Sequence, residues 1–302
     1  MVPCVSPART TDIAGQLDPQ LRRCYEHCRR VHRRHDPTYY LATRRLRGPG
    51  RLAVHALYAY VRKVDEIVDG PHRPAAPEAR RAGVDRCERE LQLALAGGPA
   101  HDPALTALVD AAARHHLPLM ELSGYFDSMR MDCAPVRIQT WDELERYMQG
   151  SAGAVGRILG VLFGVPSDRN ALFARLGLAF QLTNFIRDVR EDWELDRVYL
   201  PLEDLERFGA SVDEIARRQP STGFRRLLAL QVQRARALFR DSAGAAELVA
   251  PDVRCGMRMA RAVYIGVLDR AERLDFDVLR HRAGLRPWEL AGAVAGGLRG
   301  RR

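Results

Sequence analysis

Apolar residues recur at helical spacing along most of this 302-residue chain, and this pattern limits the folds open to it. The sequence lacks the series of alternating apolar and polar runs, bounded by turn pairs, that would predict a sheet. We therefore predict an all-α, single-domain helical bundle. Helices are expected over 19–35, 50–69, 77–96, 103–116, 119–131, 141–165, 168–193, 222–241, 251–273 and 287–298.

Glycine and proline clusters separate these segments, for example at 48–50 and 70–77. No period of about 30 to 50 residues recurs, which argues against a solenoid. The domain organisation that we expect is a flexible N-terminal tail over 1–18, one helical domain over 19–298 and a basic tail over 299–302.

The chain is basic, with 47 Lys and Arg residues against 38 Asp and Glu residues and a net charge of +9. Such a charge attracts an anionic partner, which could be nucleic acid, an anionic membrane surface or a phosphorylated substrate. The arginines of 222–241 and 251–273 are spread around their helices without an interleaved aromatic platform, so we expect no nucleic-acid partner. Peripheral contact with an anionic membrane is compatible with the sequence, although no strongly amphipathic terminal helix demands it.

The longest uncharged apolar run, residues 158–166, has nine residues and is too short to cross a bilayer. The first residues contain no apolar stretch that would serve as a signal peptide, so a cytoplasmic location is expected. The six cysteines form no CxxC pair, which favours reduced thiols over a zinc site. No glycine fingerprint follows a strand, so no bound nicotinamide is expected.

Two aspartates continue the apolar face of the helix expected over 50–69. At about 100° per residue, one stripe about 80° wide takes in Val54, Tyr58, Val61, Asp65 and Asp69. Both carboxylates should therefore point toward the interior. Arg62 lies one turn before Asp65, on the same side.

A second polar stripe lies on the helix expected over 168–193. Its members stand at positions i, i+3, i+7 and i+11, and they are Gln181, Asn184, Asp188 and Asp192. This spacing places a line of oxygen ligands at the edge of a buried surface.

Several carboxylates that face one cleft need compensation. Two of them about 6 Å apart, at an effective dielectric constant near 20, repel by roughly 3 kcal/mol. Their position in the last turn of a helix adds about 0.3 to 1 kcal/mol. Divalent metal ions shared with a phosphate group would resolve this repulsion, and Mg²⁺ prefers such oxygen ligands. The alternative is that the aspartates pair with neighbouring arginines on a solvated rim.

At these residues the sequence resembles the squalene/phytoene synthase family, whose all-helical enzymes join prenyl diphosphates head to head. The similarity runs from about Tyr25 to Arg282. Five segments carry it: HDPTYYLATRRL (35–46), YAYVRKVDEIVD (58–69), RYMQGSAGAVG (146–156), QLTNFIRDVREDWELDRVYLP (181–201) and ARAVYIGVLD (260–269). The resemblance implies a bundle of the isoprenoid synthase type around a central cavity.

The resemblance also implies roles for individual residues. The ligands of two or three Mg²⁺ ions would be Asp65, Asp69, Asn184, Asp188 and Asp192. Diphosphate would be held, or the ligands supported, by Arg62, Gln181, Asn184 and Arg187. Tyr147 and Tyr264 would line the reaction chamber, and Arg197 and Tyr199 would belong to a flap. Aromatic walls that stabilise a carbocation would come from Tyr39, Tyr40, Tyr58, Tyr147, Phe180 and Phe185.

The reaction implied is Mg²⁺-dependent prenyl transfer. Its main form is the head-to-head condensation of two geranylgeranyl diphosphates to phytoene through a cyclopropyl diphosphate. Asp36, Pro37 and Glu66 depart from the family pattern near the second diphosphate site. Two alternatives therefore stay open: transfer of one prenyl group to a small aromatic acceptor, and condensation of farnesyl diphosphate of the squalene or dehydrosqualene type. Thr43 and His55, which by resemblance face the hydrocarbon tunnel, do not decide the chain length.

Overall fold

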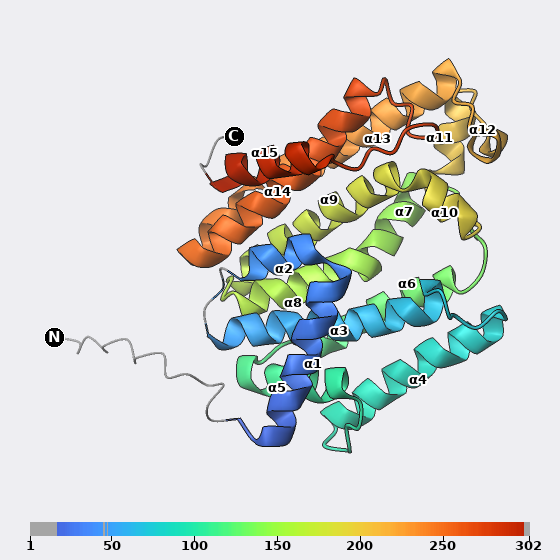
Figure 1. Ribbon diagram of the computed structural model, residues 1–302. Coiled ribbons are helices and arrows are strands. Elements are labelled where there is room, and N and C mark those ends of the chain that lie inside the picture. The colour runs from blue at the N-terminus through green and yellow to red at the C-terminus, as the bar shows by residue number, and fades with distance from the viewer. Residues whose placement is uncertain (1–16, 45, 47, 299–302) are drawn as a thin grey trace.

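The structure is a computed structural model that describes residues 17–44, 46 and 48–298, and Figure 1 shows that it is built from packed helices. The α-helices are α1 (Pro19–His35), α2 (Pro37–Thr43), α3 (Pro49–Asp69), α4 (Pro77–Leu95), α5 (Pro103–His115), α6 (Leu122–Asp132), α7 (Trp141–Met148), α8 (Ala154–Leu162), α9 (Ala171–Arg187), α10 (Val189–Glu194), α11 (Leu202–Arg207), α12 (Val212–Arg217), α13 (Thr222–Asp241), α14 (Pro251–Arg273) and α15 (Pro287–Leu298). Short 3₁₀ helices are η2 (Leu119–Glu121), η4 (Ser167–Arg169) and η5 (Ala243–Leu248), and η3 (Gln149–Gly153) is a π-helical turn. The predicted all-α class is confirmed.

Local sequence explains where several helices begin. The Asp18 carboxylate accepts hydrogen bonds from the Gln20 and Leu21 backbone amides, and proline follows at the first position of α1. Asp102 caps α5 in the same way. Leu17 is buried, so residues 17 and 18 of the predicted tail belong to the helical body. Residues 1–16 of that tail and the basic segment 299–302 lie outside the described residues.

Two of the long predicted helices are divided. The helix expected over 141–165 contains the π turn η3. Within this turn the Gly150 backbone lies against α6, where a Cβ atom would stand 2.2 Å from the Gly124 carbonyl oxygen. The helix expected over 168–193 breaks at Asp188, whose φ of −107° and ψ of 18° leave the helical region. Asp192 therefore lies on the short helix α10 rather than on α9.

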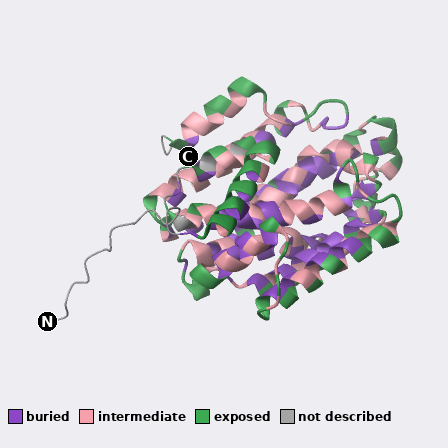
Figure 2. Cartoon of the chain, turned by 60° about the horizontal axis from the view of Figure 1, so that its bottom comes forward, coloured by how far each residue is buried: buried purple, intermediate pink, exposed green. Residues whose placement is uncertain are grey.

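Buried side chains form two large apolar clusters. One lies among α1, α3, α4, α5 and α6, and the other among α7, α9, α13 and α14. Figure 2 shows the buried residues on the inner faces of the helices and the exposed ones on their outer faces. Contacts of α6 with η3 and of α2 with α14 connect the two groups of helices. Asp69 of α3 and Asp192 of α10 lie near this junction, since the charge of Asp69 contributes to the raised pKa of Asp192.

Two strands of two residues each fix the segment after α10. In a parallel pair, Val136 of β1 (Val136–Arg137) is in register with Arg197 of β2 (Arg197–Val198). This pairing holds the segment that contains Arg197 and Tyr199 beside the C-terminal end of α6. Within the described part of the chain, no helix combines the length and apolar character needed to span a membrane.

Candidate active site

The first acidic stripe lies on the last two turns of α3. The Asp65 carboxylate accepts a hydrogen bond of 2.6 Å from the Tyr125 hydroxyl of α6. Asp69, one turn later, accepts a hydrogen bond of 2.6 Å from the Arg197 guanidinium. The pKa of Asp65 is raised to about 7, chiefly by burial and also by the nearby charges of Asp69 and Asp132, against the lowering effects of Tyr125 and Arg62.

The second stripe is divided between α9 and α10. Burial raises the pKa of Asp192 well above its ordinary range, and the charges of Asp188, Asp132 and Asp69 add to that rise. The Asp188 carboxylate is bound by its own neighbour, because Arg187 donates to it at 2.7 Å. The Asn184 amide donates to the Gln181 side-chain oxygen at 3.4 Å, whereas the Asn184 Oδ1 atom is buried without a hydrogen-bond partner among the described residues.

These carboxylates act on one another, which shows that they share one region. The charge of Asp69 raises the pKa values of Asp65, Asp132 and Asp192, which lie on three different helices. Residues of both predicted acidic stripes therefore lie close enough to influence one another's charge. Like charges at such distances favour the binding of a cation or of protons.

Arginines neutralise part of this charge. Arg197 pairs with Asp69, Arg187 with Asp188, and Arg62 with Glu66. Among the ion pairs of the described residues, none joins an arginine to Asp65 or Asp192. Within the same residues, no three His, Cys, Asp or Glu side chains are gathered closely enough to hold a metal ion.

Asp132, the last residue of α6, is a site residue that the sequence analysis missed. Its side chain is 3% exposed and accepts hydrogen bonds from the Tyr147 hydroxyl and, at 2.7 Å, from the Tyr199 hydroxyl. Burial raises its pKa to about 6. A signal for it exists, because Tyr125, Ser128 and Asp132 stand at i, i+3 and i+7 on the buried face of α6. The helix predicted over 119–131 ended one residue too early to include it.

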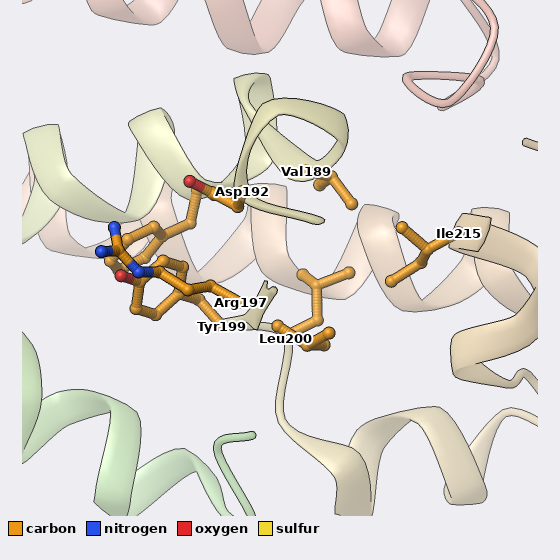
Figure 3. Close-up of a pocket in the computed structure, with 8 residues that line it drawn as sticks. Val189, Asp192, Arg197, Tyr199, Leu200 and Ile215 are labelled. Carbon is orange, nitrogen blue, oxygen red and sulfur yellow. The ribbon is translucent and has the colours of Figure 1, made fainter. Parts of the chain in front are cut away.

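Asp192, Arg197 and Tyr199 line a small cavity together with apolar side chains. Figure 3 shows the three polar groups gathered on one side of it, with Val189, Leu200 and Ile215 on the other. Its volume of about 10 Å³ is at the lower limit of the space that one water molecule needs. A larger cavity of about 550 Å³ lies between α6, α7 and η3, and of the predicted site residues it is lined by Tyr147 alone.

The predicted aromatic walls form three groups, two of which lie beside acidic residues. In the first, the Tyr147 ring lies 5.2 Å from that of Tyr199, which stacks on Phe185 at 4.1 Å. In the second, Tyr264 of α14 packs against Phe180 at 4.4 Å between ring centroids. The charges of Arg187 and Asp188 act on the Tyr264 phenol, so this ring lies beside the second acidic stripe.

A third aromatic group surrounds a histidine pair. The ring of His32 stacks on Tyr58 at 4.1 Å and lies 5.0 Å from Tyr39. The Nδ1 atoms of His32 and His55 are 2.9 Å apart, within hydrogen-bond distance. Burial lowers the pKa of His32 to about 3 and that of His55 to about 4, so both rings are neutral at physiological pH. Thr43 is also buried, and its hydroxyl donates to the Tyr40 carbonyl oxygen.

The three residues that depart from the family pattern have structural partners here. The Asp36 carboxylate accepts a hydrogen bond of 2.8 Å from the Tyr39 backbone amide, at the start of α2. Pro37 is the first residue of that helix, where its missing N–H group costs nothing. Glu66 binds Arg62 and lies 3.7 Å from the His35 ring.

The squalene/phytoene synthase family model matches residues 32–289. The chain is 35% identical to a 15-cis-phytoene synthase of Synechocystis, covering 86% of this chain and 80% of that protein. It is 37% identical to a phytoene synthase of Thermus thermophilus, covering 87% and 88%.

Solved structures agree with these matches. A squalene synthase of Alicyclobacillus acidocaldarius superposes with a TM-score of 0.79 at 31% identity, covering 87% of this chain and 98% of that one. A dehydrosqualene synthase in complex with a ligand shares the fold, with a TM-score of 0.82 at 24% identity over 92% and 96% of the two chains.

The fold and the site thus define an all-helical enzyme of the isoprenoid synthase type. The chain belongs to the squalene/phytoene synthase family, and it is a prenyltransferase that acts on prenyl diphosphates. Bacterial phytoene synthases are among its relatives, as the resemblance implied. Enzymes of this family are generally dependent on divalent metal ions.

Proposed function

We propose that this enzyme joins two molecules of geranylgeranyl diphosphate head to head and forms phytoene through a cyclopropyl diphosphate. The observation that supports the proposal is the link between the two acidic stripes: Arg197, which follows α10, donates to Asp69 of α3, and Asp69 and Asp188 both act on Asp192. The identity of 35% with a phytoene synthase over most of both chains supports this choice of reaction.

The polar groups near the junction are of the chemical type that binds Mg²⁺, and because no three acidic side chains of the described residues gather at one point, diphosphate oxygens would complete the ligand sets. Asp65 and Asp192 are carboxylates without an arginine partner among the described ion pairs, and the Asn184 Oδ1 atom is buried without a donor. Mg²⁺ prefers this kind of hard oxygen ligand. Two or three ions would be held by Asp65, Asp69, Asn184, Asp188 and Asp192. When bound, the metal neutralises the charge that develops on the departing diphosphate.

The cationic side chains of the protein assist at the same place. Arg62 acts on Asp65, and Arg187 binds Asp188, so each acidic stripe carries a guanidinium group beside it. These groups, with Gln181, orient the diphosphate by charge and hydrogen bonds. Exchange of a carboxylate partner for a diphosphate oxygen would free Asp188 to act as a ligand.

The aromatic side chains then stabilise the allylic cation that remains. A desolvated cation gains about 2 kcal/mol or more over an aromatic face. The ring groups around Tyr147 and Tyr264 lie next to the acidic residues, and Tyr39 and Tyr58 extend the wall toward α1. The protein residues thus bind, orient and exclude water, and no covalent protein nucleophile is required.

The setting of the enzyme is part of the proposal. The proposed location is the cytoplasm, as expected from the sequence. There the enzyme contacts the surface of an anionic membrane, since its product is lipid-soluble and the chain carries a net charge of +9. On α15 the Trp288 side chain is 66% exposed, in a position to enter a lipid interface.

Product analysis tests the reaction. The enzyme is incubated with Mg²⁺ and prenyl diphosphates of ten, fifteen and twenty carbons, each alone, and the hydrocarbons are identified. A C40 product from the C20 substrate is expected. A C30 product from the C15 substrate alone would favour condensation of the squalene or dehydrosqualene type instead, in line with the structural similarity to a squalene synthase. Product formation only after an added aromatic compound would favour transfer to an aromatic acceptor.

A further inference from the structure

We propose that Asp132 is a positioning residue for this reaction, which fixes the Tyr147 ring and the Arg197–Tyr199 segment against the acidic stripe of α3. The proposal rests on the function proposed above. Asp132 is the last residue of α6, where the helix dipole disfavours a negative charge, and its side chain is 3% exposed. A buried carboxylate at such a place requires compensating partners.

The partners of Asp132 come from separate parts of the chain. Its carboxylate accepts hydrogen bonds from Tyr147 of α7 and from Tyr199, which follows β2. Its main-chain oxygen accepts a hydrogen bond of 2.7 Å from Arg197. The same guanidinium nitrogen of Arg197 donates to Asp69 of α3. One residue of α6 therefore connects the first acidic stripe, a predicted chamber tyrosine and the segment after α10.

This arrangement determines which surface the aromatic residues present. Because both tyrosine hydroxyls are directed to Asp132, the orientation of the two rings is fixed, with Tyr199 stacked on Phe185. A cation is stabilised by the face of a ring, so the orientation matters more than the mere presence of the side chain. Asp132 acts through these rings and through Arg197.

Asp204 offers a matched control within the same chain. Its side chain is 2% exposed and accepts hydrogen bonds from Gln231 at 2.9 Å and from Arg234. It is a buried, charge-paired aspartate like Asp132, but its partners belong to α13 and include none of the proposed site residues. Asp204→Asn thus reports the cost of neutralising a buried carboxylate without disturbing the site.

The experiment compares Asp132→Asn, Asp204→Asn and Tyr199→Phe in the full chain. Hydrogen exchange of residues 197–200 is measured without substrate, and kcat and KM are measured as diphosphate release. We expect faster exchange at 197–200 in Asp132→Asn, with kcat lowered roughly 10²-fold and KM changed less than about threefold. Asp204→Asn should lower the melting temperature but keep kcat within about twofold.

A double variant tests whether Asp132 acts through Tyr199. If it does, Asp132→Asn with Tyr199→Phe loses little more activity than Asp132→Asn alone. Should Asp132→Asn fail to fold, Tyr147→Phe and Tyr199→Phe each remove one hydrogen bond while the carboxylate stays, and the same exchange and kcat changes, in smaller measure, are expected.

Two results would overturn the positioning role: a wild-type kcat in Asp132→Asn, or an equal loss of kcat in Asp204→Asn. Unchanged exchange at 197–200 would contradict the anchoring of the segment. These results differ from failure of the proposed function, which would appear as a wild-type enzyme that forms no C40 product from the C20 substrate.

Discussion

Arg197 donates a hydrogen bond of 2.6 Å to Asp69, although 128 positions of sequence separate the two residues. The Arg197 side chain is 3% exposed, and its guanidinium also lies 4.0 Å from the Asp132 carboxylate. Burial alone would lower the pKa of Arg197, but Tyr199, Asp132 and Asp69 raise that pKa by more, so the arginine stays charged. The segment after α10 is thereby held across the end of α3.

Removing this arginine should destabilise the protein. In Arg197→Met, Asp69 and Asp132 lose the guanidinium group that they share. Breaking a buried ion pair costs about 3 to 5 kcal/mol, and the cost is smaller here because Asp69 is partly exposed to solvent. We expect a loss of about 2 kcal/mol in the free energy of unfolding, measured by urea denaturation in metal-free buffer. Arg217→Met, which breaks an exposed pair with Asp213, is the control and should cost less than about 0.5 kcal/mol. Equal losses in both variants would contradict the assignment.

The pH dependence of stability should carry the signature of Asp65. Its pKa is raised from 3.8 to about 7 in the folded state, so the native protein holds a proton that the unfolded chain releases. The stability contributed by this group is therefore complete below about pH 4 and is lost as the pH rises to about 7. Without metal, Asp65→Asn should be more stable than wild type at pH 8, by at least about 1 kcal/mol after allowance for partial exposure.

Urea denaturation of wild type and Asp65→Asn between pH 5 and pH 8, with EDTA present throughout, measures whether the variant is the more stable protein at high pH. The two unfolding free energies should approach each other toward acid pH and diverge toward pH 8. The reverse order, with wild type the more stable at pH 8, would show that the fold stabilises Asp65 as an anion. It would contradict the claim that burial and neighbouring carboxylates raise the pKa of Asp65. Addition of Mg²⁺ should raise the stability of wild type more than that of the variant.

The Tyr264 ring should matter for its face rather than its hydroxyl. Tyr264→Phe keeps the ring that packs on Phe180, so kcat should stay within about threefold of wild type. Tyr264→Leu removes an aromatic face, and a loss of about 2 kcal/mol in transition-state stabilisation corresponds to roughly a 30-fold lower kcat. Steady-state diphosphate release distinguishes the two variants. A Tyr264→Phe enzyme as slow as Tyr264→Leu would assign the role to the hydroxyl instead.

Local pattern predicted the acidic stripes because helix periodicity is a property of neighbouring residues. The helix expected over 50–69 differs from α3 by one residue at its start. Asp65 is partly buried, as expected, whereas the Asp69 side chain is 39% exposed and lies at the edge of the interior instead of within it. The division at Asp188 was missed, because no glycine or proline marks the end of α9 in the sequence. Asp192 still reaches the same region from α10.

Contacts distant in sequence were beyond that reasoning. Nothing near Tyr125 indicates that its hydroxyl binds Asp65, 60 positions away. The role of Asp132 depends on Tyr199, 67 positions later, and on a two-residue strand pair that gives no periodic signal. The family resemblance identified Arg197 and Tyr199 as flap residues, but only the structure shows that they bind Asp69 and Asp132.

The most direct test of the account is diphosphate release from geranylgeranyl diphosphate by wild type, Asp65→Ala and Asp188→Ala, with Mg²⁺ or with EDTA. One substitution lies in each acidic stripe, and Asp213→Ala, on the exposed surface, is the control. We expect release only with Mg²⁺, a loss of at least roughly 10²-fold in each stripe variant, equivalent to about 2.7 kcal/mol, and no loss in the control. Release in the presence of EDTA, or full activity in both stripe variants, would contradict a reaction centred on the two stripes.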